Sequence, residues 1–384
     1  MQMAEKPNSH DTNTLNSLLL DLKESAFTSF AIIDLENIKK NYQILAQKAS
    51  HSIIAAAVKA DAYGLGDLEV TEVLYEEGAR HFFVATYEEG VTLKKYFKDS
   101  NIYVLYGPQE GNCAGFKKHN LIPVLNSLDQ VRLWIDETTK SRKDYPAFLH
   151  VDTGMNRLGL TQEEFKIFDN KKIMYSFSLQ GIMSHLACAE EPKNPLNQIQ
   201  LDRFLNIKNK IPEIAASFAN SAGIFLDPKY HFDMVRPGIA LYGGYPTPNL
   251  PNPMNNILQL YAKILQIKKI NKGDSVGYGA TFVAPHAMTI GIISYGYADG
   301  LLRSASNRGE VYYKGQYLKI LGRVSMDLMA VDLTPILSLE PEIDDLVELI
   351  GQHLSLDKVA DFMGTIHHEV LTSLRDRMYR FYMK

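Results

Sequence analysis

The sequence predicts a (β/α)8 barrel in its N-terminal part and a smaller, mainly β domain after it. From about Phe27 to Gly244, eight short β-prone apolar runs alternate with amphipathic helical stretches. This alternation favours a closed parallel barrel, with an open doubly wound sheet as the alternative. Beyond a Pro- and Asn-rich segment at Thr247–Asn256, short β-prone runs follow one another with close turn signals.

The barrel elements follow in order along the chain. The eight predicted strands are SIIAAAV, HFFVAT, NIYVLYG, LIPVLNS, AFLHVDT, LQGIMSHL, EIAASFANS and DMVRPGIALYG. Each is rich in apolar residues and is bounded by polar or turn-forming residues, as expected of a buried strand. The helical stretches between them include DLEVTEVLYEEGA, VTLKKYF, LDQVRLWIDETTK and NQIQLDRFLNIKN.

The β-rich domain is predicted from about Ile257 onward. Its strand candidates are LQLYAKILQIKKI, MTIGIISYGY, EVYYKGQYLKILGRV, MAVDL and DLVELIG, with a hairpin around Lys314 and Gly315. A short helix at SLDKVADFMG and an Arg-rich tail complete the chain. We therefore divide the chain into a polar, partly flexible extension at residues 1–26, a barrel at 27–256 and a β-rich domain at 257–384.

The overall composition excludes several classes of protein. Forty basic against 44 acidic residues give a formal charge of −4, which offers no broad attraction for nucleic acid. The only two cysteines, Cys113 and Cys188, lack the paired spacing of a metal site, and their scarcity fits a reducing compartment. No apolar run approaches the roughly 18 residues of a membrane span, and the polar N-terminus lacks a signal-peptide layout. We expect a cytoplasmic protein with no metal, nucleic-acid or membrane partner.

Polar and cationic side chains follow several of the predicted strands. If the strands form a barrel, these residues meet at one rim, where active sites of this fold lie. Taken singly, each has an ordinary explanation as a solvated surface group, a rim ion pair or a helix cap. Their joint occurrence favours a single pocket. The residues are Lys59, Tyr63, Gly154, Asn156, Arg157, His185, Asn220, Ser221, Arg236, Pro237 and Gly238.

The chemistry of these groups narrows the choice of ligand. A rim lysine in surroundings of low dielectric has a lowered pKa and can form a Schiff base with an aldehyde. The stretches NSAG and RPGI supply a hydroxyl, backbone N–H groups and glycines, which suit a phosphate. An aldehyde and a phosphate in one molecule point to pyridoxal 5′-phosphate (PLP) as the cofactor.

Eight motifs occur in an order that resembles one known family. They are AAAVKADAYGLG, HVDTGMNRLG, SHLACAEE, ANSAG, VRPGIALYG, VGYGATF, SYGYADG and GRVSMDLMAVD. The ordered set, from about Phe30 to Leu333, is similar to the signatures of bacterial alanine racemases, which are PLP-dependent enzymes of fold type III. The resemblance implies a barrel followed by a β domain and a homodimer with shared active sites. It also implies interconversion of L- and D-alanine, which supplies D-alanine for peptidoglycan.

The resemblance further implies which residues act. Lys59 would carry PLP and be the base facing D-alanine, and Tyr278 of the partner subunit would be the base on the opposite face, which acts on L-alanine. Two bases are needed because racemisation removes Cα–H from one face and returns a proton to the other. Arg236 would face the pyridine nitrogen, with His185 within hydrogen-bonding reach. The remaining implied residues are Tyr63, Arg157, Asn220, Ser221, Gly238 and Ile239 around the cofactor, Arg157 at the substrate together with Tyr297 and Met326 of the partner subunit, and Asp327 and His150 behind them.

The sequence departs from the family pattern at two places. His150 lies seven residues before Arg157, where many relatives have a lysine that is often carbamylated. A carbamate cannot form on histidine, so we expect a chloride ion or another side chain to hold Arg157. The tail SLRDRMYRFYMK replaces the more usual RVPR pattern, and no tyrosine there clearly matches the one that relatives place at the phosphate.

Two other functions fit parts of this pattern. The first is a racemase of the same fold with a broader or serine-directed preference. The sequence does not separate such an enzyme from one that prefers alanine. One methylene in an apolar pocket changes the free energy of discrimination between two substrates by only about 1–3 kcal/mol. The second is a non-catalytic PLP-binding protein. Such a protein would be a lone barrel without a tyrosine base, and the VGYGATF and SMD segments argue against it.

Overall fold

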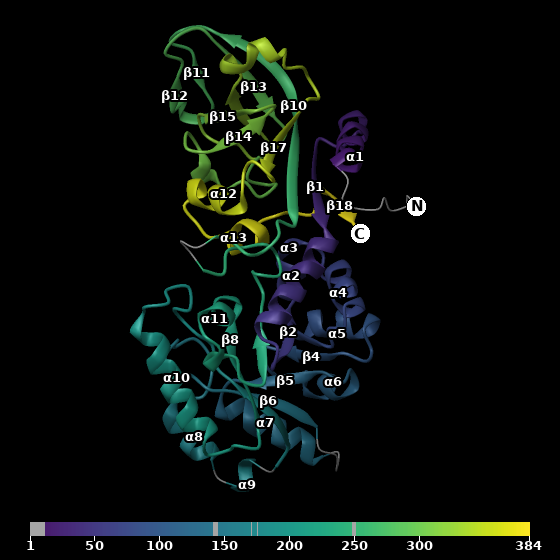
Figure 1. The fold of residues 1–384 in the computed structure, drawn as a ribbon, viewed down its shortest axis with the longest axis vertical. Helices are drawn as coiled ribbons and strands as arrows, with labels where there is room; N and C mark the ends of the chain where they lie inside the picture. The colour runs from purple at the N-terminus through teal and green to yellow at the C-terminus, as the bar shows by residue number, and fades with distance from the viewer. Residues whose placement is uncertain (1–11, 141–144, 170, 175, 248–250) are drawn as a thin grey trace. The chain divides into compact units, whose positions relative to one another are not determined.

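The computed structural model describes residues 12–140, 145–169, 171–174, 176–247 and 251–384. The chain divides into two compact units, one formed by Ile38–Met254 and the other by Met1–Asn37 together with Asn255–Lys384 (Figure 1). We call them the barrel unit and the sheet unit. Within the described residues, no helix is long and apolar enough to cross a membrane.

The barrel unit contains a closed barrel of parallel strands, as predicted. Its strands are β2 (Ile53–Ala57), β3 (His81–Val84), β4 (Asn101–Val104), β5 (Ile122–Leu125), β6 (Pro146–His150), β7 (Ser178–Met183), β8 (Ala215–Asn220) and β9 (Met234–Arg236). Neighbours in the chain pair in parallel, and β9 returns to pair with β2, which closes the sheet. Each of the predicted β-rich runs overlaps one of these strands.

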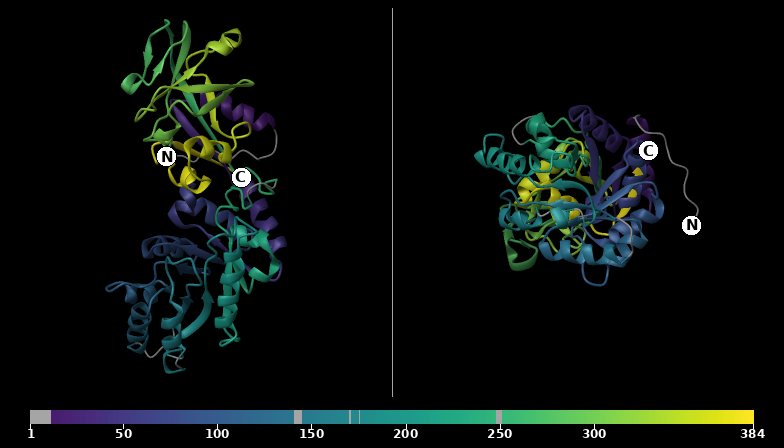
Figure 2. Two further views of the ribbon diagram at one scale, coloured as in Figure 1. Left: turned by 90° about the vertical axis from the view of Figure 1, so that its left-hand side faces the viewer. Right: turned by 90° about the horizontal axis from the view of Figure 1, so that it is seen from below.

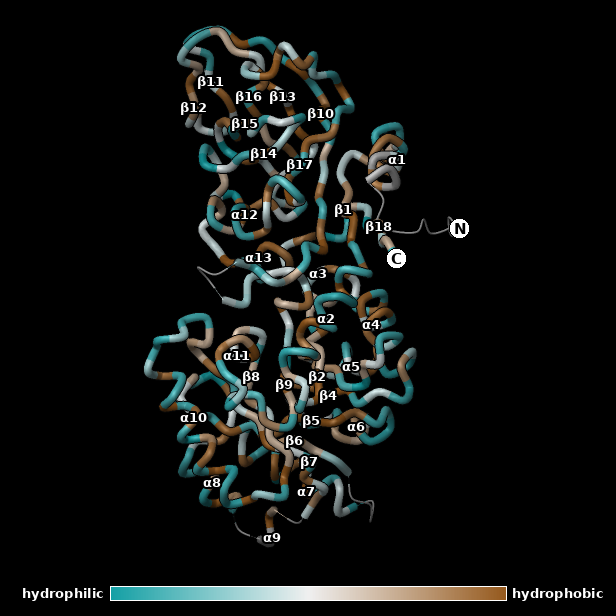
Figure 3. The backbone as a smooth tube through the Cα atoms, viewed as in Figure 1, coloured by the Kyte–Doolittle hydropathy of each residue, from teal (hydrophilic) through white to brown (hydrophobic). Residues whose placement is uncertain are grey.

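Helices lie outside these strands (Figures 1 and 2). They include α2 (Leu35–Lys48), α4 (Asp67–Glu76), α5 (Tyr87–Tyr96), α6 (Cys113–Lys118), α7 (Leu128–Thr139), α8 (Gln162–Phe168), α10 (Pro195–Lys208) and α11 (Ser221–Leu226). Side-chain hydrogen bonds cap the N-termini of several of these helices. Thr86 and Glu89 form a capping box at α5, and Thr161 and Glu164 form another at α8. Both hydrophilic and hydrophobic residues occur along α8 and α10 (Figure 3). The buried face of α10 is itself mixed, with Asn197, Gln200, Leu201, Phe204 and Ile207.

Apolar side chains from the strands fill the barrel interior. Phe83 and Tyr103 stack with their ring centroids 4.6 Å apart, and Tyr103 meets Phe148 edge-on at 4.8 Å. Gly181 makes room for Phe148, because a Cβ atom on this glycine would lie 2.5 Å from the ring. Close packing of this kind resists deformation, so residues at the carboxyl ends of the strands keep fixed positions. The cluster consists of Ala55, Ala57, Phe83, Tyr103, Ile122, Val124, Phe148, Met183 and Met234.

The sheet unit is built on an eight-stranded sheet ordered β13-β16-β15-β14-β17-β10-β1-β18. Its strands are β1 (Ser29–Asp34), β10 (Leu258–Ile270), β13 (Met288–Ile293), β14 (Glu310–Tyr313), β15 (Gln316–Leu321), β16 (Met329–Asp332), β17 (Leu346–Ile350) and β18 (Tyr379–Met383). The predicted hairpin is present, since β14 and β15 pair around Lys314 and Gly315. The φ angles of these two residues, 39° and 96°, suit a tight turn. The predicted helix is α12 (Leu356–Met363), capped by Ser355.

The structure places the N-terminal boundary of the barrel differently from the predicted division at Phe27. Strand β1 pairs antiparallel with β10 and parallel with β18, so it belongs to the sheet unit. Its sequence is apolar like that of a barrel strand, and pairing with distant segments cannot be read from such a pattern. In the predicted extension, α1 (Thr12–Glu24) packs Leu18 and Leu22 against Phe30 of the same sheet. Residues 1–11 of the extension and 248–250 of the predicted linker lie outside the described residues.

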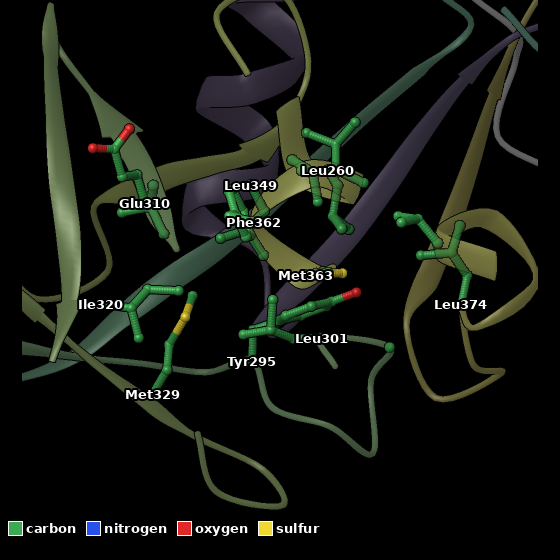
Figure 4. Close-up of a pocket in the computed structure, with 15 residues that line it drawn as sticks. Leu260, Tyr295, Leu301, Glu310, Ile320, Met329, Leu349, Phe362, Met363 and Leu374 are labelled. Atoms are coloured by element: carbon green, nitrogen blue, oxygen red, sulfur yellow. The ribbon is translucent and has the colours of Figure 1, made fainter. Parts of the chain in front are cut away.

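A small void lies inside the sheet unit, between the sheet and α12 (Figure 4). Its volume of about 10 Å³ admits at most one water molecule. The lining is mostly apolar, and the Tyr295 hydroxyl beside it donates to the carbonyl of Asp299 at 3.0 Å. We therefore assign the void to imperfect packing of the core and not to a ligand site.

Candidate active site

Lys59 lies directly after β2, at the carboxyl end of a barrel strand. The preceding residues Ala55–Val58 are buried, and the lysine side chain is partly buried. Burial lowers the pKa of Lys59, the charge of Arg157 lowers it further, and Glu89 opposes both. A larger fraction of this amine is therefore neutral near neutrality than for a surface lysine. A neutral amine is the form that attacks an aldehyde or accepts a proton.

The chain makes one turn of left-handed helix immediately after Lys59. Ala60, Asp61, Ala62 and Tyr63 have φ angles of 54°, 55°, 48° and 61°. Such a conformation costs an L-residue roughly 1–2 kcal/mol, so it persists only where its surroundings impose it. Oε1 of Glu89 accepts a hydrogen bond from the Ala60 N–H at 2.8 Å. Further hydrogen bonds run from the Asp67 N–H to the Asp61 carboxylate and from the Ala62 N–H to the Val58 carbonyl. The turn brings Tyr63 from the surface back into the barrel unit.

A polar cradle forms where Tyr63 meets the loop after β9. Ser221 Oγ accepts hydrogen bonds from the N–H groups of Gly238 at 2.9 Å and Ala240 at 3.2 Å. A Cβ atom on Gly238 would lie 2.3 Å from the Tyr63 hydroxyl, so only glycine fits there. Burial raises the pKa of Tyr63 to about 12, which keeps its hydroxyl protonated and able to donate. The Tyr63 phenol and the Ser221 hydroxyl, whose oxygen already accepts two N–H groups, are donors that suit a phosphate.

The structure places Asn220 and Ile239 beside this cradle. The Asn220 side chain accepts from the Gly223 N–H at 2.9 Å and so caps α11. This is the helix-cap reading that the sequence also allowed. Ile239 is buried between Gly238 and Ala240. Both are near the predicted phosphate end, but the contact seen for the Asn220 side chain serves the fold.

Arg236 ends β9 and is buried beneath the rim. Its guanidinium donates to Ser217 Oγ, to the carbonyl of Ser184 and, at 3.4 Å, to Nδ1 of His185. Burial lowers the pKa of Arg236 to about 9, with Arg157 contributing, so the group stays cationic at neutral pH. Burial and Arg236 hold the pKa of His185 well below its usual value, so the imidazole is neutral and accepts. The expected pairing of Arg236 with His185 is therefore present.

His150 ends β6 and is buried, with only 6% of its surface exposed. Its Nδ1 lies 2.8 Å from Oδ1 of Asn126. The Asn126 amide nitrogen donates to the carbonyls of Leu105 and Val124, so Oδ1 is the acceptor and His150 Nδ1 carries the hydrogen. Burial, Arg236 and Arg157 lower the pKa of His150 to about 3. The ring is neutral, with Nε2 left as a hydrogen-bond acceptor.

Arg157 lies on a loop that the backbone holds tightly. Oδ1 of Asp152 accepts from the N–H groups of Gly154, Met155 and Asn156, and the Leu160 N–H closes the loop on the His150 carbonyl at 2.8 Å. The Arg157 side chain is exposed and makes no hydrogen bond or ion pair with another described residue. The expectation that a chloride ion or another side chain holds this guanidinium therefore stays a prediction.

The remaining predicted residues belong to the sheet unit. Tyr278 stands in a short 3₁₀ turn (Tyr278–Ala280) and is 71% exposed. Tyr297 and Met326, also exposed, sit on two loops joined by hydrogen bonds from the Tyr297 N–H to the Ser325 carbonyl and from the Ala298 N–H to the Met326 carbonyl. The structure thus brings the loops of Tyr297 and Met326 together, and their role at a substrate stays a prediction.

The fold and these residues define a two-unit barrel enzyme with a lysine at the carboxyl end of a strand and an anion cradle beside it. The family model for the alanine racemase N-terminal domain matches residues 33–246, and the model for the C-terminal domain matches residues 257–382. The chain therefore belongs to the alanine racemase family, a family of isomerases, and the resemblance drawn from its motifs is confirmed.

Individual relatives agree along nearly the whole chain. The alanine racemase of Rickettsia canadensis is 42% identical over 354 residues, which cover 92% of this chain and 98% of the relative. That of Brucella abortus is 41% identical over 378 residues, covering 94% and 96%. Among solved structures, the alanine racemase of Bartonella henselae with covalently bound pyridoxal phosphate has a TM-score of 0.90 at 40% identity, covering 93% of this chain and 99% of its own.

Sequence reasoning missed several residues that shape the site. Glu89 and Asn126 orient the turn after Lys59 and the ring of His150. The T-x-x-E pattern of Thr86 and Glu89 predicts a helix start but gives no sign that the same carboxylate reaches another strand end. Ser217 accepts a hydrogen bond from Arg236, and Arg377 forms ion pairs with Asp299 and Asp327. No sequence pattern indicated either contact.

Proposed function

We propose that this chain is a PLP-dependent alanine racemase that interconverts L- and D-alanine by two bases. Lys59 acts on one face of the substrate, and Tyr278 of the partner subunit acts on the other. The observation that carries the proposal is Lys59 itself, a partly buried lysine of lowered pKa at the end of a barrel strand in a chain of this family. The covalently bound pyridoxal phosphate of the Bartonella relative supports the choice of cofactor. We further propose a cytoplasmic homodimer whose product supplies peptidoglycan.

The residues at the rim fit this cofactor. When bound, PLP would offer an aldehyde to a lysine amine and, through its ring, an electron sink that acidifies the Cα–H of an amino acid. Lys59 would hold the aldehyde carbon. The Tyr63 hydroxyl, Ser221 and the N–H groups around Gly238 would hold the phosphate, since a Cβ atom would fill the space that glycine leaves there. Arg236 would lie at the ring nitrogen, where a permanent cation disfavours protonation of that nitrogen.

The proton at Cα is moved by the protein. Burial and the charge of Arg157 lower the pKa of Lys59, which favours the neutral amine, and this group would take or return the proton on its own face. Inversion needs a second group on the opposite face. The strongly exposed hydroxyl of Tyr278 is available for this role to a second chain, which supports a homodimer with shared sites. The exposed guanidinium of Arg157 would bind the substrate carboxylate together with Tyr297 of the partner subunit and the backbone N–H of Met326 of the partner subunit.

The test compares Lys59→Ala and Tyr278→Phe with the wild-type holoenzyme. Racemisation and α-proton exchange in D2O are followed for L-alanine, D-alanine and L-serine. Each base removed is expected to lower the racemisation rate roughly 10²–10⁴-fold or more. Tyr278→Phe should retain exchange of D-alanine without inversion, because Lys59 still serves that face. Lys59→Ala should lose covalent attachment of the cofactor, as seen by mass spectrometry after borohydride reduction.

Matched variants separate these effects from general damage. Lys166→Ala removes an exposed lysine of α8, and Tyr317→Phe removes an exposed tyrosine hydroxyl of β15. Both should racemise alanine at the wild-type rate. Full activity of Lys59→Ala and Tyr278→Phe in both directions would refute the two-base assignment. A faster reaction with serine than with alanine would favour the serine-directed alternative.

A further inference from the structure

Arg377 joins two loops of the sheet unit that are far apart in the sequence. Its Nε and Nη2 donate to the two carboxylate oxygens of Asp299 at 2.6 and 3.0 Å. Its Nη1 lies 2.8 Å from Oδ1 of Asp327. Asp299 follows Tyr297 by two residues, and Asp327 is the residue after Met326. One guanidinium thus binds the loop of each proposed substrate-binding residue.

The two loops also meet through their backbones. Hydrogen bonds join the Tyr297 N–H to the Ser325 carbonyl at 3.1 Å and the Ala298 N–H to the Met326 carbonyl at 2.9 Å. A Cβ atom on Gly296 would lie 2.3 Å from the Met326 carbonyl oxygen, so the contact requires glycine. Asp299 additionally accepts from the Gly296 N–H at 2.8 Å. The Arg377 ion pairs therefore act on a contact that already fixes Tyr297 against Met326.

The charges of the three side chains depend on one another. Asp299 is buried, with only 3% of its surface exposed, and a buried carboxylate is costly without a cation. Arg377 supplies that cation while remaining half exposed, and the planar fork of its guanidinium is suited to bind a second carboxylate at the same time. An ammonium group carries the charge but lacks the fork. The pKa of Arg377 is raised by its hydrogen bonds to both aspartates, so its guanidinium stays charged at any physiological pH. We call Arg377, Asp299 and Asp327 together the clasp.

We propose that Arg377 is a positioning residue for substrate binding. It holds the loops of Tyr297 and Met326 at the spacing that the alanine carboxylate requires, without touching the substrate itself. The inference rests on the proposed racemase function. It assigns a role to the tail segment SLRDRMYR, in which the sequence departs from the usual family pattern.

The test measures KM and kcat for L- and D-alanine in the holoenzymes of wild type, Arg377→Gln and Arg377→Lys. Arg377→Gln should raise KM for both enantiomers about tenfold, the effect of roughly one lost charged hydrogen-bond pair on binding. The value of kcat and the cofactor content should change less than twofold. Arg377→Lys should recover part of the KM because it restores the charge but not the fork.

Two further variants keep the test decisive. Arg375→Gln changes an exposed arginine two residues away whose side chain makes no hydrogen bond or ion pair with another described residue, so its KM should equal that of wild type. Asp327→Asn removes the exposed arm of the clasp and leaves Asp299 paired, so it tests the proposal even if Arg377→Gln folds poorly. Its KM should rise, and the double variant Arg377→Gln/Asp327→Asn should have a KM no higher than Arg377→Gln alone.

The outcomes separate the two proposals. A lower melting temperature with unchanged KM in both Arg377→Gln and Asp327→Asn would show a merely structural clasp and overturn the positioning role. Equal KM increases in Arg375→Gln and Arg377→Gln would overturn it as well. Absence of alanine racemisation by the wild-type holoenzyme would instead overturn the proposed function and the inference built on it.

Discussion

The carboxylate of Glu89 holds the backbone of Ala60, the residue directly after Lys59. Oε1 accepts the Ala60 N–H at 2.8 Å, while Oε2 accepts the N–H groups of Ala85 at 2.7 Å and Thr86 at 3.1 Å. The same side chain thus ties the end of β2 to the end of β3. This link supports the left-handed turn that would otherwise be too costly to persist.

Replacing Glu89 should weaken the barrel unit. Glu89→Gln keeps the length of the side chain. Its amide has only one oxygen to accept the three N–H groups that the two carboxylate oxygens accept in wild type. We expect a loss of about 1–3 kcal/mol in the free energy of unfolding, measured by urea denaturation. Glu88→Gln makes the same chemical change at the exposed neighbouring position and should stay within about 0.5 kcal/mol of wild type. Equal stabilities of the two variants would contradict the role of Glu89.

The left-handed turn predicts an unusual response to glycine. Ala60 is exposed and has a φ of 54°, a conformation that glycine adopts without a steric cost. Glycine removes the steric cost of the left-handed conformation, about 1–2 kcal/mol in the folded state. This gain should outweigh the loss of about 0.5–1 kcal/mol that arises because glycine makes the unfolded chain more flexible. Ala60→Gly should therefore be neutral or stabilising by up to about 1 kcal/mol. Ala46→Gly in the right-handed helix α2 should instead destabilise by about 1 kcal/mol. Similar losses for both variants in thermal unfolding would refute the left-handed turn.

The sequence predicted the barrel because each of its strands is a continuous apolar run that ends in polar residues. The predicted division at Phe27 nevertheless placed β1 on the barrel side. Its run SFAIID looks like a barrel strand, and only its pairing with β10 and β18 places it in the sheet unit. The rim residues Lys59, His185 and Arg236 could be grouped from sequence because the carboxyl ends of parallel strands meet at one edge.

The supporting contacts could not be predicted in this way. The ion pair of Arg377 with Asp299 spans 78 residues, and the hydrogen bond of His150 with Asn126 spans 24. Neither distance repeats a helical or strand period, so no local pattern connects the partners. Which polar residue supports a site is decided by tertiary packing, whereas which residues reach the rim is decided largely by topology.

The buried His150 should make stability depend on pH. Its pKa is about 3 in the folded protein against an ordinary value of 6.5, so the unfolded chain binds the proton more tightly. Stability is therefore fully retained above about pH 6.5 and lost progressively as the pH falls toward 3, by up to about 1.4 kcal/mol per pH unit for one proton. His185 acts in the same direction. His150→Gln should flatten the dependence of the unfolding free energy on pH between roughly pH 6.5 and 4.5, the upper part of the range between the two pKa values.

Denaturation at several pH values would measure this slope. His51→Gln, which changes an exposed histidine, is the matched control and should leave the slope as in wild type. An unchanged slope in His150→Gln would show that this ring is not held neutral by its surroundings. A loss of stability that is the same at every pH would indicate a packing defect alone.

The contact of Gly238 with Tyr63 predicts a rescue. In Gly238→Ala, the new methyl group would lie 2.3 Å from the Tyr63 hydroxyl and 3.0 Å from Cζ. Such overpacking should destabilise the barrel unit by about 1–3 kcal/mol. Tyr63→Phe removes the atom in closest contact, so Gly238→Ala should cost less in that background than in wild type. Because neighbouring residues couple, the difference should be about 0.5–3 kcal/mol in a double-mutant cycle.

Tyr242 provides the control for this cycle. Its ring lies 4.8 Å from that of Tyr63, but its hydroxyl donates to the carbonyl of Ala57 and not toward Gly238. Tyr242→Phe removes the same atom type from the same cluster and should leave the cost of Gly238→Ala unchanged. Rescue by Tyr242→Phe, or none by Tyr63→Phe, would mean that the phenol does not press on Gly238. A neighbour other than Tyr63 would then require glycine at position 238. The proposed place of the Tyr63 hydroxyl at the phosphate would no longer be supported by this contact.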